Sequence, residues 1–253
     1  STINGGMVGP SFHKLGVEGL KAKFGTDQAI SILKESMNFV GFLENFLKTE
    51  NIDAEFKRVG RFRGAVKPEH LDSLARELDI LKETIGVKGE IIAKADQASE
   101  TGSQLFHGGV SYYQDSFLHP AKYHNGLVQK VLEAGAKIYS HTPVVHFEKQ
   151  GLSYTVTTSR GSLKANKIAV CTNGYTGKVT QELRRRILPI RSAMIATEEI
   201  SPELMDKLMP KGKACGDSRR LVAYYRPSPD GKRILFGSRA SGLKTIHKLM
   251  LET

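Results

Sequence analysis

Tryptophan is absent from this 253-residue chain, and cysteine occurs only twice. Cys171 and Cys215 lie far apart and outside any CxxC or Cys/His zinc spacing, so the sequence indicates neither a disulfide framework nor a zinc knuckle. Long hydrophobic runs are also missing. The run 168–171 is far shorter than the roughly 20 residues that cross a bilayer, and the first residues have no signal-peptide pattern. We therefore expect no membrane span and a cytoplasmic location.

The short motifs that carry a known mechanism are missing as well. The sequence contains no GxGxxG, no Walker phosphate loop, no HExxH and no GxSxG,. Its histidines show no metal-ligand spacing. We predict no metal site, and no catalytic residue can be named from a motif.

Basic residues outnumber acidic residues by 37 to 26, for a net charge of +11. This excess favours an anionic partner, such as nucleic acid, acidic lipid or a phosphate-bearing cofactor. The one dense cluster, 184–186 followed by Arg191, is more typical of a solvated turn or helix end than of a binding patch. With 40% hydrophobic and 25% charged residues, the composition is that of an ordinary globular protein of one large or two small domains.

Apolar residues recur at intervals of three and four in several segments, which predicts helices. The first runs from Thr26 or Asp27 to Leu47, and the second from Pro68 to a stop at Gly86,. Further helices are predicted over 119–135, over a short stretch capped by Ser201, and over 242–251. Strands are predicted over 136–140, 144–148, 154–158, 167–172 and 188–197, with a hairpin of 221–226 and 233–237. A helix that leads into a strand and a hairpin indicates an α/β arrangement with an antiparallel insert.

Three local patterns are more specific when they are taken together. The first is the Asn-Gly-Gly run 4–6, where paired glycines let a backbone approach a ligand closely. The second is a strand exit at 171–175, in the place where open α/β sheets bind ligands. The third is a glycine turn and aromatic pair, 108–113, that leads into Leu-His-Pro at 118–120. Each one alone is equally well read as a turn or a strand exit.

In this order, the three patterns resemble the FAD-dependent oxidoreductases of the D-amino-acid oxidase and glycine oxidase superfamily, in particular the gamma-glutamylputrescine oxidoreductase-like branch. Three further runs fit the same branch: Gly-Ala at 135–136, Tyr-Tyr-Arg at 224–226 and Ile-Leu-Phe-Gly at 234–237. The resemblance covers almost the whole chain. It implies oxidation of a C–N bond by hydride transfer to flavin, with a small amine or amino acid as substrate.

The resemblance also implies where the ligands bind. The residues expected to bind FAD are Asn4, Gly5, Gly6, Val144, Thr172, Asn173 and Gly174. The residues expected to bind substrate are Tyr113, Tyr224, Tyr225 and Arg226, with Arg239 as a weaker choice. Arg226 could clamp a carboxylate with both its amino groups, but an arginine that only packs along a sheet fits the same pattern.

The expected fold is mixed α/β, with a partial FAD-binding domain and a substrate domain built on a mixed or antiparallel sheet. The resemblance assigns 1–25 and 105–180 to the FAD-binding domain and 26–104 and 181–253 to the substrate domain. The family's glycine-rich dinucleotide fingerprint is not in this sequence, so we expect an internal fragment that binds FAD weakly and is inactive alone. Two alternatives remain: a non-catalytic remnant, and a basic module that binds nucleic acid.

Overall fold

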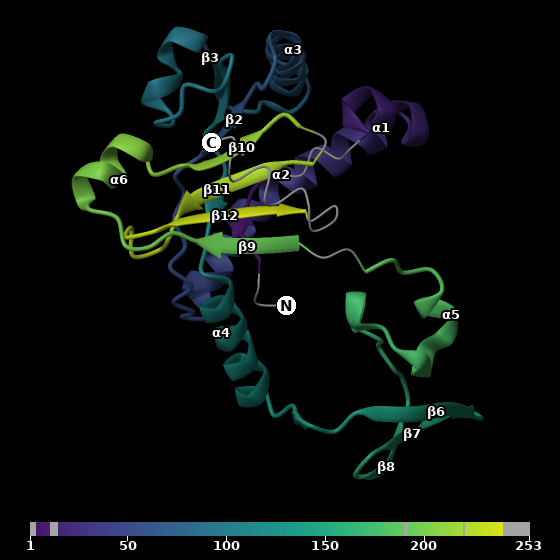
Figure 1. Ribbon diagram of the computed structural model, residues 1–253. Helices are drawn as coiled ribbons and strands as arrows, with labels where there is room; N and C mark the ends of the chain where they lie inside the picture. The colour runs from purple at the N-terminus through teal and green to yellow at the C-terminus, as the bar shows by residue number, and fades with distance from the viewer. Residues whose placement is uncertain (1–3, 11–14, 190–191, 220, 240–253) are drawn as a thin grey trace. The chain divides into compact units, whose positions relative to one another are not determined.

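The computed structural model describes residues 4–10, 15–189, 192–219 and 221–239 (Figure 1). The chain divides into two compact units. One contains the described residues up to Lys130 together with those from Ser192 onward, and the other contains the described residues from Val131 to 189. Each unit is described by itself below. The predicted helix over 242–251 lies outside the described residues.

The first unit is built on a seven-stranded mixed sheet. In spatial order its strands are β3 (Gly89–Ile92), β4 (Gly109–Tyr112), β2 (Arg61–Gly64), β10 (Ala214–Asp217), β11 (Ala223–Pro227), β12 (Ile234–Arg239) and β9 (Ser192–Ala196). The β2–β10 pair is parallel and the other pairs are antiparallel. The predicted hairpin is therefore confirmed as β11–β12, and the expected mixed α/β class is confirmed.

Three helices cover one face of this sheet, called here the α3 face. They are α1 (Gly16–Phe24), α2 (Thr26–Thr49) and α3 (Pro68–Ile85). Leu20, Leu33 and Leu78 are buried here against Val110 of β4. The helix α3 begins with Pro68 and ends at Gly86, whose φ of 71° is left-handed, as the sequence predicts. Burial of each of these leucines contributes about 2 kcal/mol to the stability of this layer.

The opposite face, called here the α6 face, is covered by α6 (Pro202–Leu208) and the 3₁₀ helix η1 (Lys94–Ser99). The Ser201 hydroxyl caps α6 by accepting a hydrogen bond from the Leu204 amide at 3.3 Å,. Met205 packs there against Phe62 and Cys215 of the sheet. Because strand side chains alternate, the register assigns successive residues of β11 to opposite faces.

A smaller part of the first unit holds the N-terminal strand. The strand β1 (Met7–Val8) pairs with β5 (Ser116–Phe117) in antiparallel register, with Met7 opposite Phe117. Directly after β5, α4 (Pro120–Glu133) begins at the predicted proline, and its first half packs against Leu118, Ile52 and α2. This strand pair carries the Asn4–Gly6 run toward the large sheet.

The second unit is a three-stranded antiparallel sheet of β6 (Val144–Gln150), β7 (Ser153–Thr158) and β8 (Gly161–Ala165). It is followed by η2 (Asn173–Tyr175), η3 (Lys178–Thr180) and α5 (Gln181–Arg184). The strands predicted over 136–140 and 167–172 are wrong for the described structure, since neither run is a strand. Both runs are largely exposed, and a short run that pairs with no other strand does not form a sheet.

Candidate functional site

The Asn4–Gly6 run, called here the glycine segment, forms a tight turn at the start of the described chain. The Asn4 side-chain oxygen accepts a hydrogen bond from the Gly6 amide at 2.8 Å, which is a local turn that asparagine favours. Gly6 has a φ of 61°, and a Cβ there would lie 2.2 Å from the Leu118 carbonyl oxygen. Only glycine fits this position.

Arg226 of β11 is buried directly against the glycine segment, with 2% of its surface exposed. Its Nε donates to the Gly5 carbonyl at 2.6 Å and its Nη2 to the Leu118 carbonyl at 3.0 Å. Nη1 donates to the Pro227 carbonyl at 3.0 Å, and the guanidinium lies 4.6 Å from the Phe117 ring centroid. Burial lowers the pKa of Arg226 to about 10, so the side chain still carries its charge at neutral pH. The guanidinium thus ties together three separate stretches of backbone.

Tyr224 lies on the same face of β11, with its ring in a slot between two glycines. A Cβ on Gly5 would lie 2.9 Å from the ring, and a Cβ on Gly237 would lie 2.3 Å from it. Gly237 is opposite Tyr224 on β12, whereas Gly216 is opposite it on β10 and leaves room, with nothing closer than 3.8 Å. The missing side chains therefore let the ring lie flat against the backbone. No hydrogen bond to its hydroxyl is found among the described residues.

The other two predicted tyrosines lie elsewhere in the first unit. Tyr225 lies on the α6 face, where its hydroxyl is 2.7 Å from that of Thr101 and burial raises its pKa. Tyr113 follows β4 and is 43% exposed. Desolvation and a hydrogen bond to Glu90 raise the pKa of Tyr113 to about 12. Only Tyr224 of the three predicted tyrosines therefore lies against the glycine segment.

The remaining predicted flavin contacts belong to the second unit. Val144 begins β6 and is 42% exposed. Thr172, Asn173 and Gly174 form an exposed turn in which Asn173 has a left-handed φ of 45°. Their role stays a prediction. The side chain of Arg239 lies outside the described residues.

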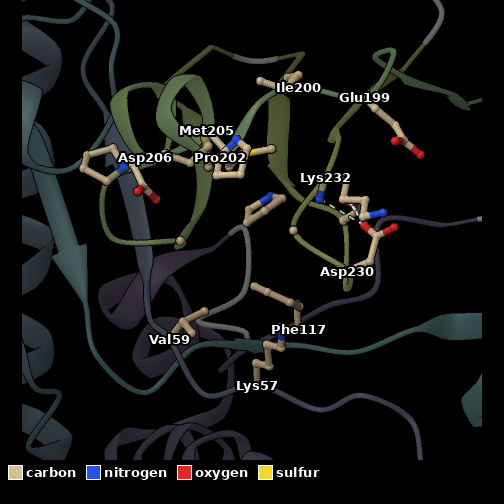
Figure 2. A pocket seen from close by; sticks show the side chains of 16 residues that line it. Lys57, Val59, Phe117, Glu199, Ile200, Pro202, Met205, Asp206, Asp230 and Lys232 are labelled. Atoms are coloured by element: carbon tan, nitrogen blue, oxygen red, sulfur yellow. Dashed lines mark hydrogen bonds between the residues drawn. The ribbon is translucent and has the colours of Figure 1, made fainter.

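A groove of about 700 Å³ lies between α6, the β11–β12 turn and residues 57–59. Figure 2 shows Phe117 and Val59 on one side of this groove and Met205 and Pro202 on the other. Lys57, Asp206 and Lys232 also line it. The residues of the glycine segment and Tyr224 are not among its lining residues, so the groove is separate from the slot.

Two residues of this region were not predicted to have a role. Gly237 could have been found, since a glycine inside a strand often marks a close approach. Asp115, which is buried beside Gly9, gives no signal in the sequence. No group of three or more potential metal ligands comes together among the described residues, and no described helix is long and apolar enough to span a membrane.

The comparison with known proteins identifies a family for the chain. Residues 1–248 match the family model described as FAD dependent oxidoreductase. The chain belongs to this family. Among curated members, a probable oxidoreductase OrdL of Rhizobium meliloti is 27% identical over 93% of this chain. The gamma-glutamylputrescine oxidoreductase of Escherichia coli is 25% identical over 92% of it.

Solved structures of two glycine oxidases share the fold. Glycine oxidase from Bacillus cereus superposes with a TM-score of 0.70 at 14% identity, over 99% of this chain and 68% of that one. Glycine oxidase from Geobacillus kaustophilus gives a TM-score of 0.67 at 16% identity, over 95% and 62%. The chain spans 54% of the Rhizobium meliloti relative and 54% of the Escherichia coli relative.

The packing of the glycine segment bears on the expected contact with a flavin ring. At Gly5 and Gly237 the space beside the backbone is filled by the Tyr224 ring, and at Gly6 it is filled by the Leu118 carbonyl oxygen and the Arg226 guanidinium, so these glycines allow close packing within the chain itself. The dinucleotide fingerprint that holds a pyrophosphate at a helix N-terminus is absent from the sequence,. A contact of the glycine segment with the ring of the cofactor therefore stays a prediction.

Proposed function

We propose that this chain forms the ring side and the substrate side of the active site in a flavin-dependent oxidoreductase that oxidises a C–N bond of a small amine or amino acid. The observation that supports this most is the contact of the glycine segment with Tyr224 and Arg226. These two residues lie more than 200 positions after the glycine segment in the sequence. When bound there, the flavin would supply the hydride acceptor for the carbon beside the nitrogen.

The residues of the chain would orient the substrate beside the ring. The Tyr224 hydroxyl is the candidate donor to a substrate oxygen, because the glycine slot fixes its ring from both sides. Asn4, Gly5 and Gly6 are the candidate contacts to the flavin ring. Holding the two partners in a reactive geometry supplies much of the acceleration in such reactions.

The contacts of Arg226 support a positioning role for this residue over a carboxylate clamp. Three backbone carbonyls already accept from its guanidinium, and 2% exposure leaves little access for a substrate. Arg226 would then act through Gly5, by holding the glycine segment in place. The clamp predicted from the sequence stays the alternative.

The FAD-binding and substrate parts of the proposed site do not need to follow the two compact units. The glycine segment and Tyr224 both lie in the first unit, while the predicted contacts Thr172 to Gly174 lie in the second. The predicted division into an FAD-binding domain and a substrate domain therefore stays a proposal about which residues contact each ligand.

The test is a titration of the purified chain with FAD, followed by flavin fluorescence and by thermal melts. We expect saturable but weak binding, with a Kd above about 1 µM, since the sequence contains no GxGxxG fingerprint to hold the pyrophosphate,. A 100-fold excess of FAD over Kd should stabilise the chain by about 2.7 kcal/mol. No turnover of amines is expected from the chain alone.

A matched pair of glycine variants makes this titration specific. Gly237→Ala places a methyl group against the Tyr224 ring, whereas Gly216→Ala adds one on the other side of Tyr224 where there is room. We expect Gly237→Ala to weaken FAD binding about tenfold or more, and Gly216→Ala to leave it unchanged. Equal effects would contradict the slot. Absence of any FAD binding would favour the non-catalytic alternative, and salt-sensitive binding of nucleic acid would favour the basic module.

A further inference from the structure

Asp115 is a buried carboxylate that the proposed reaction does not use. It lies in the turn between β4 and β5 and is 5% exposed. Its cationic neighbour among the described residues is Arg61 of β2, whose Nε lies 3.0 Å from Oδ1. The Arg61 guanidinium in turn lies 5.1 Å from the Tyr112 ring centroid. The pair therefore connects the β4–β5 turn to the large sheet.

The carboxylate is pressed against the N-terminal strand at Gly9. A Cβ on Gly9 would lie 2.1 Å from the Asp115 Oδ1, so any other residue there would collide with the carboxylate. From the other side, the Gly60 amide donates to the Asp115 carbonyl at 2.9 Å. Gly60 has a φ of 82°, and a Cβ there would lie 2.7 Å from the Tyr112 carbonyl oxygen. Two glycines thus make room for this one turn.

Burial of such a carboxylate in its charged form costs free energy of folding. Burial raises the pKa of Asp115, and Arg61 offsets this rise only in part. A buried ion pair is weak evidence for stability, and an apolar pair in its place often stabilises a fold equally well. The pair can instead fix the position of the chain. The carboxylate of Asp115 approaches the backbone closely at Gly9, and this contact allows one register of β1.

We propose that Asp115 and Arg61 form an anchor that sets the position of β1, and through it the position of the glycine segment. Asp115 is a positioning residue in this scheme. The strand β1 pairs with β5, which directly follows Asp115. One residue further on, the Leu118 amide donates to the Gly6 carbonyl at 2.9 Å. The anchor, the strand pair and the glycine segment therefore form one continuous chain of contacts.

The inference depends on the proposed function only for its consequence, which is the placement of a flavin ring. The experiment therefore reads the segment itself, by amide hydrogen exchange of the whole chain in NMR. The variants are Asp115→Asn, which removes the charge and keeps the shape, and Gly9→Ala, which crowds the carboxylate from the opposite side. The control is Glu77→Gln, which breaks the ion pair of Arg63, on the same strand as Arg61, at 3.1 Å.

We expect the Leu118 amide to exchange about tenfold faster in Asp115→Asn and in Gly9→Ala, with amides of β10 and β11 unchanged. The amide resonances of Gly5 and Gly6 should shift in both variants, and Glu77→Gln should change neither. Where FAD binds, its Kd should rise in the two variants and not in the control.

Unchanged exchange at Leu118 would overturn the anchor. Uniformly faster exchange over the whole sheet, with a lower melting temperature, would also overturn it, because that pattern is the one expected of a pair that only stabilises the fold. If FAD does not bind to any form, the proposed function fails while the exchange data still decide the anchor.

Discussion

At the scale of single residues, burial decides which role the side chain of Arg226 can have. Its place beside two tyrosines suggests a substrate clamp, but its guanidinium donates to the carbonyls of Gly5, Leu118 and Pro227. Buried carbonyls need partners, and loss of a charged donor costs more than loss of a neutral one. Arg226 is therefore a structural link between β11 and the glycine segment.

This link can be tested with a variant that keeps the charge. Arg226→Lys retains an ammonium but cannot reach three carbonyls with the planar geometry of a guanidinium. We expect the free energy of unfolding to fall by about 2–4 kcal/mol. Arg63→Lys, at a partly exposed arginine with a single carboxylate partner, should change it by less than about 1 kcal/mol. Urea denaturation of both variants measures the difference, and equal losses would argue against the link.

At the scale of elements, a buried ionic network joins η1, β4 and β10. Glu100, which follows η1, accepts hydrogen bonds from Lys211, from Lys213 at 2.7 Å and from Ser111 at 3.1 Å. Burial alone would raise the pKa of Glu100, but the two lysines outweigh it and hold the pKa below its ordinary value of 4.5. A carboxyl with a lowered pKa in the folded state stabilises the protein above pH 4.5 and loses this effect as the pH falls.

We therefore expect Glu100→Gln to lower the free energy of unfolding by about 3 kcal/mol at pH 7, since Lys213 is left buried without its carboxylate. The variant should also lose the part of the acid destabilisation that begins below pH 4.5. Denaturation curves between pH 3 and pH 7 measure both effects. Glu44→Gln is the control, because Glu44 also pairs with two cations but at the surface. A loss as large for Glu44 would contradict the role of burial.

Two glycines of the helical layer have opposite effects on their helices. Gly86 ends α3 in the left-handed conformation, while Gly41 lies inside α2 with no atom within 4 Å of an added Cβ. Gly41→Ala should raise the free energy of unfolding by about 0.5–1 kcal/mol, because alanine favours a helix interior. Gly86→Ala should lower it by about 1 kcal/mol. Thermal melts of the two variants test the signs, and a stabilising Gly86→Ala would show that α3 ends differently.

At the scale of the whole molecule, the two units differ in how much they bury. The first has three clusters of buried hydrophobic residues. Among the described residues of 131–189, Val156 is the one buried hydrophobic residue. Stability follows buried apolar area, and a small sheet needs a packed hydrophobic face to be stable by itself.

Amides of β6, β7 and β8 should consequently exchange at least about a hundredfold faster than those of β2, β4 and β10. Hydrogen exchange followed by mass spectrometry on peptides from each unit is sufficient to measure this. Added FAD that slowed exchange in β6 to β8 would support the predicted contacts of Val144 and Thr172 with the cofactor. Equal protection of the two units without ligand would contradict the difference in burial.

The sequence alone determined the features that depend on neighbouring residues. The helices α2, α3 and α6 follow from apolar spacing and from end signals such as Pro68, Gly86 and Ser201, which act within a few residues of one another,. The ordered runs of glycine, tyrosine and arginine indicated the family, and residues 1–248 match its model.

Only the tertiary structure decided which of the candidate residues meet. Tyr224 and Tyr225 are adjacent in sequence, yet the alternation of β11 assigns them to opposite faces,. Asp115 and Gly9 are more than 100 residues apart, and their contact depends on the pairing of β1 with β5. Local patterns cannot reveal such contacts, because burial and cross-strand register arise only when distant segments pack together.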